Sequence, residues 1–153
     1  AAASGFGVKA LLQRVTCASV SVGGAVVGEI GAGLLVLLGL DKGDDRPAAD
    51  RMLERLLAYR GFADAQGRMN RSVADVNGGV LLVSQFTLSA DTARGLRPGF
   101  SRALAPAEAQ ALYEYMLAGL QRRHAPVAAG VFGADMQVSL TNDGPVTFLL
   151  ESG

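Results

Sequence analysis

The stretch GVLLVSQFTL, residues 79–88, is the strongest strand in the sequence and decides the fold. It opens with an unbroken apolar run from Val80 to Val83, which is typical of a strand buried on both faces. The polar residues Ser84, Gln85 and Thr87 follow at its end. The sequence therefore predicts a core strand that brings hydroxyl, amide and backbone N–H groups to the edge of the core.

Further strands are expected on both sides of this one. Residues 33–40, GLLVLLGL, are a second fully buried strand. Residues 10–22 alternate in part between apolar and polar side chains, and Gly23-Gly24 signals a hairpin before a return strand at 25–30. The remaining strands are expected at 127–132, 135–141 and 145–150. Because the early strands adjoin as hairpins, we expect mostly antiparallel pairing.

Two segments carry helix signals. In the first, Asp44 or Asp45 can cap the helix, Pro47 fits its first turn and Gly61 stops it. The second is an amphipathic helix over residues 106–124. The apolar stripes are Ala49, Met52, Leu53, Leu56 and Leu57 in the first helix, and Ala109, Leu112, Met116, Leu117 and Leu120 in the second. Strands and two main helices together predict an α+β fold.

Length and composition narrow the class of protein. A chain of 153 residues predicts one domain, which we place at residues 8–153, and the uncharged residues 1–7 are expected to be a remnant added for expression. The net charge of zero argues against a protein that coats DNA. No apolar run approaches the ~20 residues of a membrane helix, so we expect a cytoplasmic protein. With only Cys17 and His124 as soft ligands, we expect no metal and no cofactor.

Familiar catalytic patterns are absent. Gly31 and Gly33 lack the third glycine of GxGxxG, because Val36 stands there, and no GxxxxGK[ST] occurs. A Ser/His/Asp triad would need His124, which stands at a helix end where a cation is structurally favourable. Paired carboxylates would have to come from Asp64, Asp75, Asp91 or Glu108, but no spacing singles out a pair.

Two polar stretches each allow two interpretations. The segment SQFT, residues 84–87, is either a strand end whose hydroxyls satisfy local backbone groups or a set of donors facing a pocket, able to stabilise an oxyanion without a titrating base. The segment TNDGPVTF, residues 141–148, is either a plain Asn-Asp-Gly turn or a backbone held in an unusual shape for recognition. Local sequence favours the turn.

Several short motifs, in this order and spacing, resemble the D-aminoacyl-tRNA deacylase family. The resemblance covers nearly the whole domain, from residue 9 to the end. Its motifs are QRV at 13–15, GRMN at 67–70, SQFTL at 84–88, RPGF at 97–100 and FGADMQVSLTNDGPVT at 132–147. It implies a compact, barrel-like assembly of mostly antiparallel sheets with two main helices. It also implies hydrolysis of the ester that links a D-amino acid to the terminal adenosine of tRNA, without a cofactor or metal.

The resemblance also assigns the site. Gly144 and Pro145 would form a Gly-cis-Pro pair that enters the pocket of the partner subunit, so the enzyme would be a homodimer with shared active sites. Main-chain carbonyls can exclude an L side chain without imposing side-chain identity, and glycyl-tRNA should also be cleaved. We expect Asn142 and Arg14 on the substrate side as well. Arg14 either bonds the Gly144 carbonyl or is a surface strand residue.

The remaining roles follow from the chemistry of ester hydrolysis. We expect Ser84, Gln85, Phe86 and Thr87 to be catalytic, with N–H groups near Phe86 and Thr87 holding the oxyanion. Thr87 as a covalent nucleophile is the alternative to assistance by the ribose hydroxyl, because no base for Thr87 is evident. Separately, Arg94 and Arg97 either contact tRNA phosphates or belong to a solvated loop. Two further hypotheses for the whole protein are a non-enzymatic dimer that binds a small molecule or protein, and an L-specific editing domain.

Overall fold

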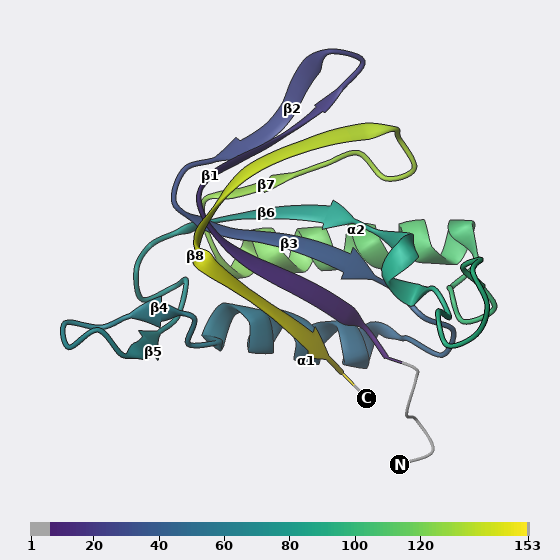
Figure 1. The fold of residues 1–153 in the computed structure, drawn as a ribbon, viewed down its shortest axis with the longest axis horizontal. Helices are drawn as coiled ribbons and strands as arrows, with labels where there is room; N and C mark the ends of the chain where they lie inside the picture. The colour runs from purple at the N-terminus through teal and green to yellow at the C-terminus, as the bar shows by residue number, and fades with distance from the viewer. Residues whose placement is uncertain (1–6, 153) are drawn as a thin grey trace.

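The structure is a computed structural model that describes residues 7–152, so residues 1–6 of the predicted expression remnant lie outside it. One sheet dominates the chain (Figure 1). Its strands are β1 (Lys9–Val22), β2 (Ala25–Ile30), β3 (Gly33–Gly39), β6 (Gly79–Ser84), β7 (Val127–Ala129) and β8 (Met136–Glu151). A separate small hairpin consists of β4 (Phe62–Ala63) and β5 (Met69–Arg71). The predicted α+β class is confirmed.

Strand pairing is antiparallel around β1 and parallel around β6. The order is β2-β1-β3-β6-β7, and β8 pairs with β1 along most of its length. The expectation of mostly antiparallel pairing is confirmed, because β1 pairs in the antiparallel sense with β2, β3 and β8. The sheet is nevertheless mixed, since the pairs β3–β6 and β6–β7 are parallel. The physical reason is that helical segments connect these strands, and a crossover returns the chain in the same direction.

The sheet curls toward a barrel. The Cβ of an alanine at Gly28 in β2 would lie only 2.6 Å from the carbonyl oxygen of Ala129 in β7, so this glycine permits close approach of the two edges. The curl encloses a small apolar cluster whose buried members are Val15, Ala18, Val20, Ile30, Leu35, Leu81 and Val83. A barrel-like shape therefore follows from the pairing and from the lack of a side chain at residue 28.

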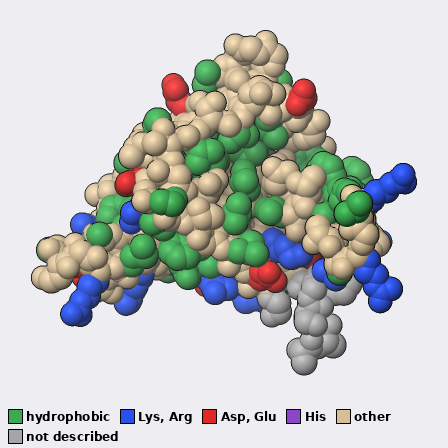
Figure 2. Space-filling model, viewed as in Figure 1, with side chains coloured by type: hydrophobic (Ala, Val, Ile, Leu, Met, Phe, Trp, Pro, Cys, Tyr) green, Lys and Arg blue, Asp and Glu red, His purple; other side chains and the backbone are tan. Residues whose placement is uncertain are grey.

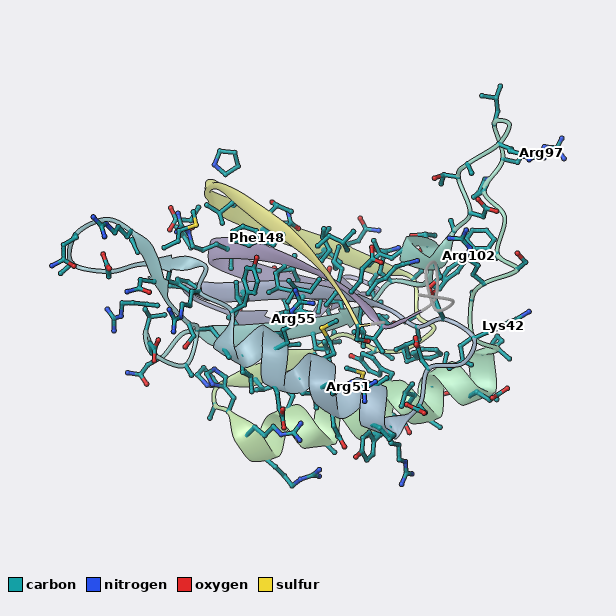
Figure 3. The ribbon with its side chains drawn as sticks, turned by 90° about the horizontal axis from the view of Figure 1, so that it is seen from below. Lys42, Arg51, Arg55, Arg97, Arg102 and Phe148 are labelled. Carbon is teal, nitrogen blue, oxygen red and sulfur yellow. The ribbon has the colours of Figure 1, made fainter. Side chains whose placement is uncertain are left out.

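Two helices cover one face of the sheet, as Figures 1 and 3 show. Helix α1 (Arg46–Ala58) begins at Asp45, whose carboxylate accepts a hydrogen bond of 3.0 Å from Ala48 N–H, and it ends before Tyr59, earlier than the predicted stop at Gly61. Helix α2 is Pro106–Arg123. Between helices and sheet lies the main core, which includes Leu12, Val36, Leu38, Met52, Leu53, Leu56, Leu82, Met116 and Leu120.

The segment 141–148 is not a turn. Strand β8 continues through it, and the pairing with β1 shifts so that Gln13 opposes Thr147 while Val15 opposes Asn142. Residues 143–146 are left without a partner on β1 and form a bulge, within which the Gly144–Pro145 peptide bond is cis. The turn prediction was wrong because local turn residues here widen one strand instead of reversing the chain.

Candidate active site

A pocket of about 450 Å³ opens where β3 and β6 end. Ser84, the last residue of β6, pairs with Leu38 of β3, and both line the pocket. Its other lining residues are Leu40, Phe86, Phe100, Ala103, Leu104, Ala105, Pro106, Ala109, Phe132 and Gly133. The carboxyl ends of parallel strands are common places for ligands. A mostly apolar wall with few polar groups suits a flat ring and a small polar reaction centre.

Within the SQFT segment, Ser84 and Phe86 line the pocket, whereas Gln85 and Thr87 adjoin them in the chain but are not lining residues. Gln85 N–H donates to the Leu38 carbonyl at 2.7 Å, and the chain then turns into a short 3₁₀ helix over Phe86–Ser89. The Gln85 side-chain amide donates to the hydroxyl oxygen of Thr87. Among the described residues, none accepts a hydrogen bond from the backbone N–H of Phe86 or Thr87. The segment thus offers free donors at the pocket edge, as the first groups of a helical turn do.

Two aromatic rings frame the pocket entrance. Phe86 is 63% exposed, and its ring lies 5.1 Å from that of Phe100, centroid to centroid. Exposure of a large aromatic side chain is unfavourable unless something covers it. Sequence reasoning placed Phe86 in the site but missed Phe100, although Phe100 belongs to the RPGF motif. It also missed Leu104 and Phe132, because loop and helix residues converge on the pocket only in the folded chain.

Three of the titratable groups considered in the sequence, His124, Asp64 and Asp75, have structural roles. His124 follows α2, and its Nε2 lies 2.7 Å from the Gly78 carbonyl oxygen. The Asp64 carboxylate accepts from Gln66 and Arg68 N–H, and that of Asp75 accepts from Ser72 N–H. These backbone donors lower the pKa of both carboxyls. Neither carboxylate lines the pocket.

A buried polar cluster supports the pocket wall. Asp41 is fully buried, and its carboxylate lies 3.2 Å from the Lys9 ammonium. Its backbone pairs with Ala103, while Asp41 N–H donates to the Asp44 carboxylate at 2.7 Å. Burial raises the pKa of Asp44 to about 6, with the nearby charges of Asp41 and Asp45 adding to the rise. Asp44 is therefore held in an environment that disfavours its charged form.

Replacing Asp44 with asparagine should change how stability depends on pH. The pKa of Asp44 is higher in the folded than in the unfolded chain. Its contribution to the free energy of unfolding is therefore most favourable at a pH below its ordinary pKa near 4, and it is lost as the pH rises through about 6. Asp44→Asn keeps the acceptor for Asp41 N–H but does not ionise. We expect the variant's Tm to exceed that of the parent chain at pH 7.5, with the advantage shrinking toward pH 4.5. A pH-independent difference in Tm would contradict this assignment.

The Gly144–Pro145 bulge lies far from the pocket of its own chain. Ser84 pairs with Leu38, Leu38 with Ala10, and Ala10 with Leu150, so Ser84 and Leu150 share one level of the sheet. Pro145 stands five residues before Leu150, which is about 16 Å along the strand, and three strand spacings add about 14 Å across the sheet. A single chain therefore does not bring Gly144 and Pro145 to Ser84.

Side chains from two directions hold the bulge. Asn142 accepts from Val146 N–H at 2.7 Å and donates to the Val146 carbonyl at 3.2 Å, so it spans the bulge. Arg14 donates to the Asp143 carbonyl at 2.9 Å and to the Gly61 carbonyl at 3.1 Å. The expected bond from Arg14 to the Gly144 carbonyl is corrected: it goes to the preceding carbonyl because the bulge turns that oxygen toward β1. Gly144 and Pro145 are both exposed.

Strand β8 presents an uncovered apolar surface beside the bulge. Val138 and Leu140 are each 36% exposed, and Leu149 is 52% exposed. Figure 2 shows hydrophobic side chains gathered across the middle of the face that carries β1 and β8 in Figure 1. Among the residues that the structure describes, β8 pairs only with β1, so its other edge is open. An exposed strand with apolar side chains is the kind of surface that pairs with another protein.

Comparisons with known proteins show which family has this sequence and fold. The family model described as D-Tyr-tRNA(Tyr) deacylase matches residues 11–151. The chain therefore belongs to the D-Tyr-tRNA(Tyr) deacylase family. Within residues 7–152, no helix is long and apolar enough to cross a membrane.

Named relatives cover almost the whole chain. The D-aminoacyl-tRNA deacylase of Stutzerimonas stutzeri is 59% identical over 145 residues, which is 95% of this chain and 100% of the relative. That of Herminiimonas arsenicoxydans is 62% identical over 142 residues, 93% of this chain and 95% of the relative. The solved structure of a c-Myc DNA unwinding element binding protein matches with a TM-score of 0.90 at 41% identity, covering 95% of this chain and 99% of the other.

Proposed function

We propose that this chain hydrolyses D-aminoacyl-tRNA and that Gly144 and Pro145 of one subunit select the D-amino acid inside the pocket of a second subunit. The reaction class follows from the family: the ester between a D-amino acid and tRNA is cleaved to free amino acid and tRNA. The observation that carries the selection mechanism is the rigidly held, exposed bulge at residues 143–146, too far from Ser84 of the same chain to act there.

Main-chain carbonyl oxygens can distinguish the chirality of an amino acid without distinguishing the identity of its side chain. The bulge presents the main chain of Gly144 and Pro145 to solvent, and neither residue has a partner on β1. A D-amino acid can turn its amino group toward such acceptors and its side chain toward open space. An L-amino acid would have to drive its side chain into the oxygens. Glycine has no side chain to exclude, so glycyl-tRNA, including glycine mischarged on tRNA(Ala), is expected to be a substrate.

A homodimer supplies the missing part of the site. The free edge of β8 and its exposed apolar side chains Val138, Leu140 and Leu149 provide a surface for a second copy. In a two-fold dimer each subunit gives and receives the same element, so one bulge can enter each pocket. The substrate is then enclosed by SQFT from one chain and Gly144–Pro145 from the other, and we place this activity in the cytoplasm.

The pocket can stabilise the reaction without an acid or base from the protein. The free N–H groups of Phe86 and Thr87 are donors for the oxyanion that forms when water attacks the ester carbonyl. The neighbouring ribose hydroxyl of the substrate can assist the water. The Thr87 hydroxyl already accepts a hydrogen bond from the Gln85 amide, and no described histidine or carboxylate contacts it to act as a base. These contacts favour ribose assistance over a Thr87 nucleophile.

Replacing Thr87 with alanine tests that preference. Loss of a covalent nucleophile costs about 10⁴-fold or more in kcat. We expect Thr87→Ala to keep kcat on D-tyrosyl-tRNA within about ten-fold of the parent, because backbone donors remain. Single-turnover measurement of ester loss gives the answer directly. A fall in kcat of about 10⁴-fold with unchanged substrate binding would instead identify Thr87 as the attacking nucleophile.

The two other hypotheses, a non-enzymatic binding module and an L-specific editing domain, are less well supported. A non-enzymatic binding module is disfavoured because the family and the named relatives are deacylases. An L-specific editing domain would be expected to carry a different dipeptide in place of Gly144–Pro145. Incubating the protein with D- and L-tyrosyl-tRNA tests both its activity and its selectivity for the D form. We expect hydrolysis of the D form at least about 100-fold faster; equal rates on both would contradict the proposed selection.

A further inference from the structure

Four basic residues lie on the two chain segments that contribute Leu40, Phe100 and Ala103 to the pocket lining. Lys42 comes two residues after Leu40, which lines the pocket, and Arg102 comes just before Ala103, which also lines it. The two segments are joined by a hydrogen bond of 2.7 Å from Lys42 N–H to the Arg102 carbonyl. Arg94 and Arg97 lie on the neighbouring loop. Figure 3 shows Lys42, Arg97 and Arg102 at the same end of the molecule, with Arg97 on a loop that projects from the body. We call Lys42, Arg94, Arg97 and Arg102 the basic rim.

The projecting loop is closed at its base and carries two arginines and an exposed leucine. Asp91 and Gly99 exchange backbone hydrogen bonds of 2.7 and 3.1 Å, which holds the two ends of the loop together. Between them lie Arg94, Arg97 and a fully exposed Leu96. The loop leaves Arg94 and Arg97 exposed to solvent, so both remain accessible to a ligand.

The three arginines of the rim form a local excess of positive charge in a neutral chain, whereas Lys42 stands among Asp41, Asp44 and Asp45. The whole chain has 14 basic and 14 acidic residues. From residue 91 to residue 104, however, Asp91 is the only acid against three arginines. The ion pairs among the described residues involve Lys9, Arg14 and Arg123, and none involves the basic rim. Unpaired cations concentrated at one site attract an anion with several charges.

We propose that the basic rim binds the backbone phosphates of the single-stranded nucleotides that precede the terminal adenosine of tRNA. This inference rests on the proposed function, because the pocket must hold that adenosine. The walls around Phe86 and Phe100 suit a base ring, which aromatic side chains bind by stacking, but they have no cation for a phosphate. The RNA chain must leave the pocket, and the segments that border the pocket carry the basic rim. A phosphate contact positions the substrate without reading its sequence.

The test compares substrates with and without phosphates. Arg97→Ala/Arg102→Ala is assayed on D-tyrosyl-tRNA and on the D-tyrosyl ester of adenosine, over a range of salt concentrations. We expect kcat/KM on the tRNA to fall at least about ten-fold at low salt, and its slope against salt on logarithmic axes to become shallower by about 1.4. The adenosine ester should be cleaved at the parent's rate. Arg122→Ala, which removes an exposed arginine at the far end of α2, is the matched control and should change neither rate.

Binding of uncharged tRNA, followed by fluorescence anisotropy, tests the inference separately from catalysis. The double variant should bind at least about ten-fold more weakly than the parent, with the same loss of salt dependence. Unchanged binding and an unchanged slope would overturn the assignment, as would an equal loss on tRNA and on the adenosine ester. A parent chain that cleaves neither ester but binds tRNA through the rim would overturn the proposed function alone.

Discussion

Replacing Gly144 with alanine is expected to lower kcat/KM on D-tyrosyl-tRNA by at least about 100-fold while the chain stays folded. Gly144 has a φ of 150°, and an added Cβ would lie 2.6 Å from Cγ2 of Val146 and 2.7 Å from its backbone nitrogen. The bulge must therefore shift to accept a side chain. Since the carbonyls of residues 144 and 145 are proposed to lie against the substrate, a shift of an ångström is enough to lose the productive geometry.

A matched control separates this effect from general strain. Gly24 also has a positive φ, 84°, but an added Cβ there would meet nothing within 4 Å. Gly24→Ala should therefore cost some stability and leave kcat/KM within about two-fold of the parent. Thermal unfolding followed by circular dichroism checks that both variants are folded at the assay temperature. Full activity of a folded Gly144→Ala variant would contradict the proposal that Gly144 lies against the substrate.

Replacing Lys9 with methionine is expected to destabilise the chain by about 3–5 kcal/mol, because it leaves a buried carboxylate without its partner. The Lys9 side chain is 11% exposed and that of Asp41 is fully buried, 3.2 Å away. Among the described residues no hydrogen-bond donor contacts the carboxylate oxygens of Asp41, although the ammonium of Lys9 lies within ion-pair distance of one of them. The short distance in a buried setting identifies Lys9 as the group that compensates this charge.

Urea denaturation measures the loss, and a double variant shows its origin. Lys9→Met/Asp41→Leu removes both charges, so it should recover most of the stability that Lys9→Met loses. If the free energy of unfolding of Lys9→Met were within about 1 kcal/mol of the parent's, the Lys9–Asp41 pair would contribute no more than an exposed ion pair does, which would contradict this prediction. Since Asp41 pairs with Ala103 of the pocket wall, Lys9→Met should also weaken substrate binding before the chain unfolds.

Features written in short stretches of sequence were predictable. The Asp45 cap and the Pro47 first turn require only the residues of one helical turn, and they are present in the structure. The apolar run from Val80 to Val83 is buried as expected, and Ser84 emerges from it at a pocket. The structural role expected for His124 also agrees with its place after α2. In each case the deciding interactions lie within a few residues along the chain.

Features that depend on distant partners were not predictable from those patterns. Asn142 to Pro145 have the composition of a turn, but pairing with β1 holds them within one long strand. The donor position of Arg14 was predicted on the correct element, yet its acceptor is one residue earlier because a bulge sets the register. The same limit applies to the pocket wall around Phe132, which helix α2 and the last loop complete only in the folded chain.

The shared active site is tested most directly by mixing two inactive variants. Gly144→Ala disables the bulge, and Ala109→Trp fills the pocket with a bulky ring. When the two are unfolded together, refolded in equal amounts and paired at random, half of the dimers are mixed. Each mixed dimer has one intact pocket facing one intact bulge, so about a quarter of the parent's activity on D-tyrosyl-tRNA should return. No recovery in a sample shown to contain mixed dimers would contradict selection by Gly144 and Pro145 across the subunit boundary.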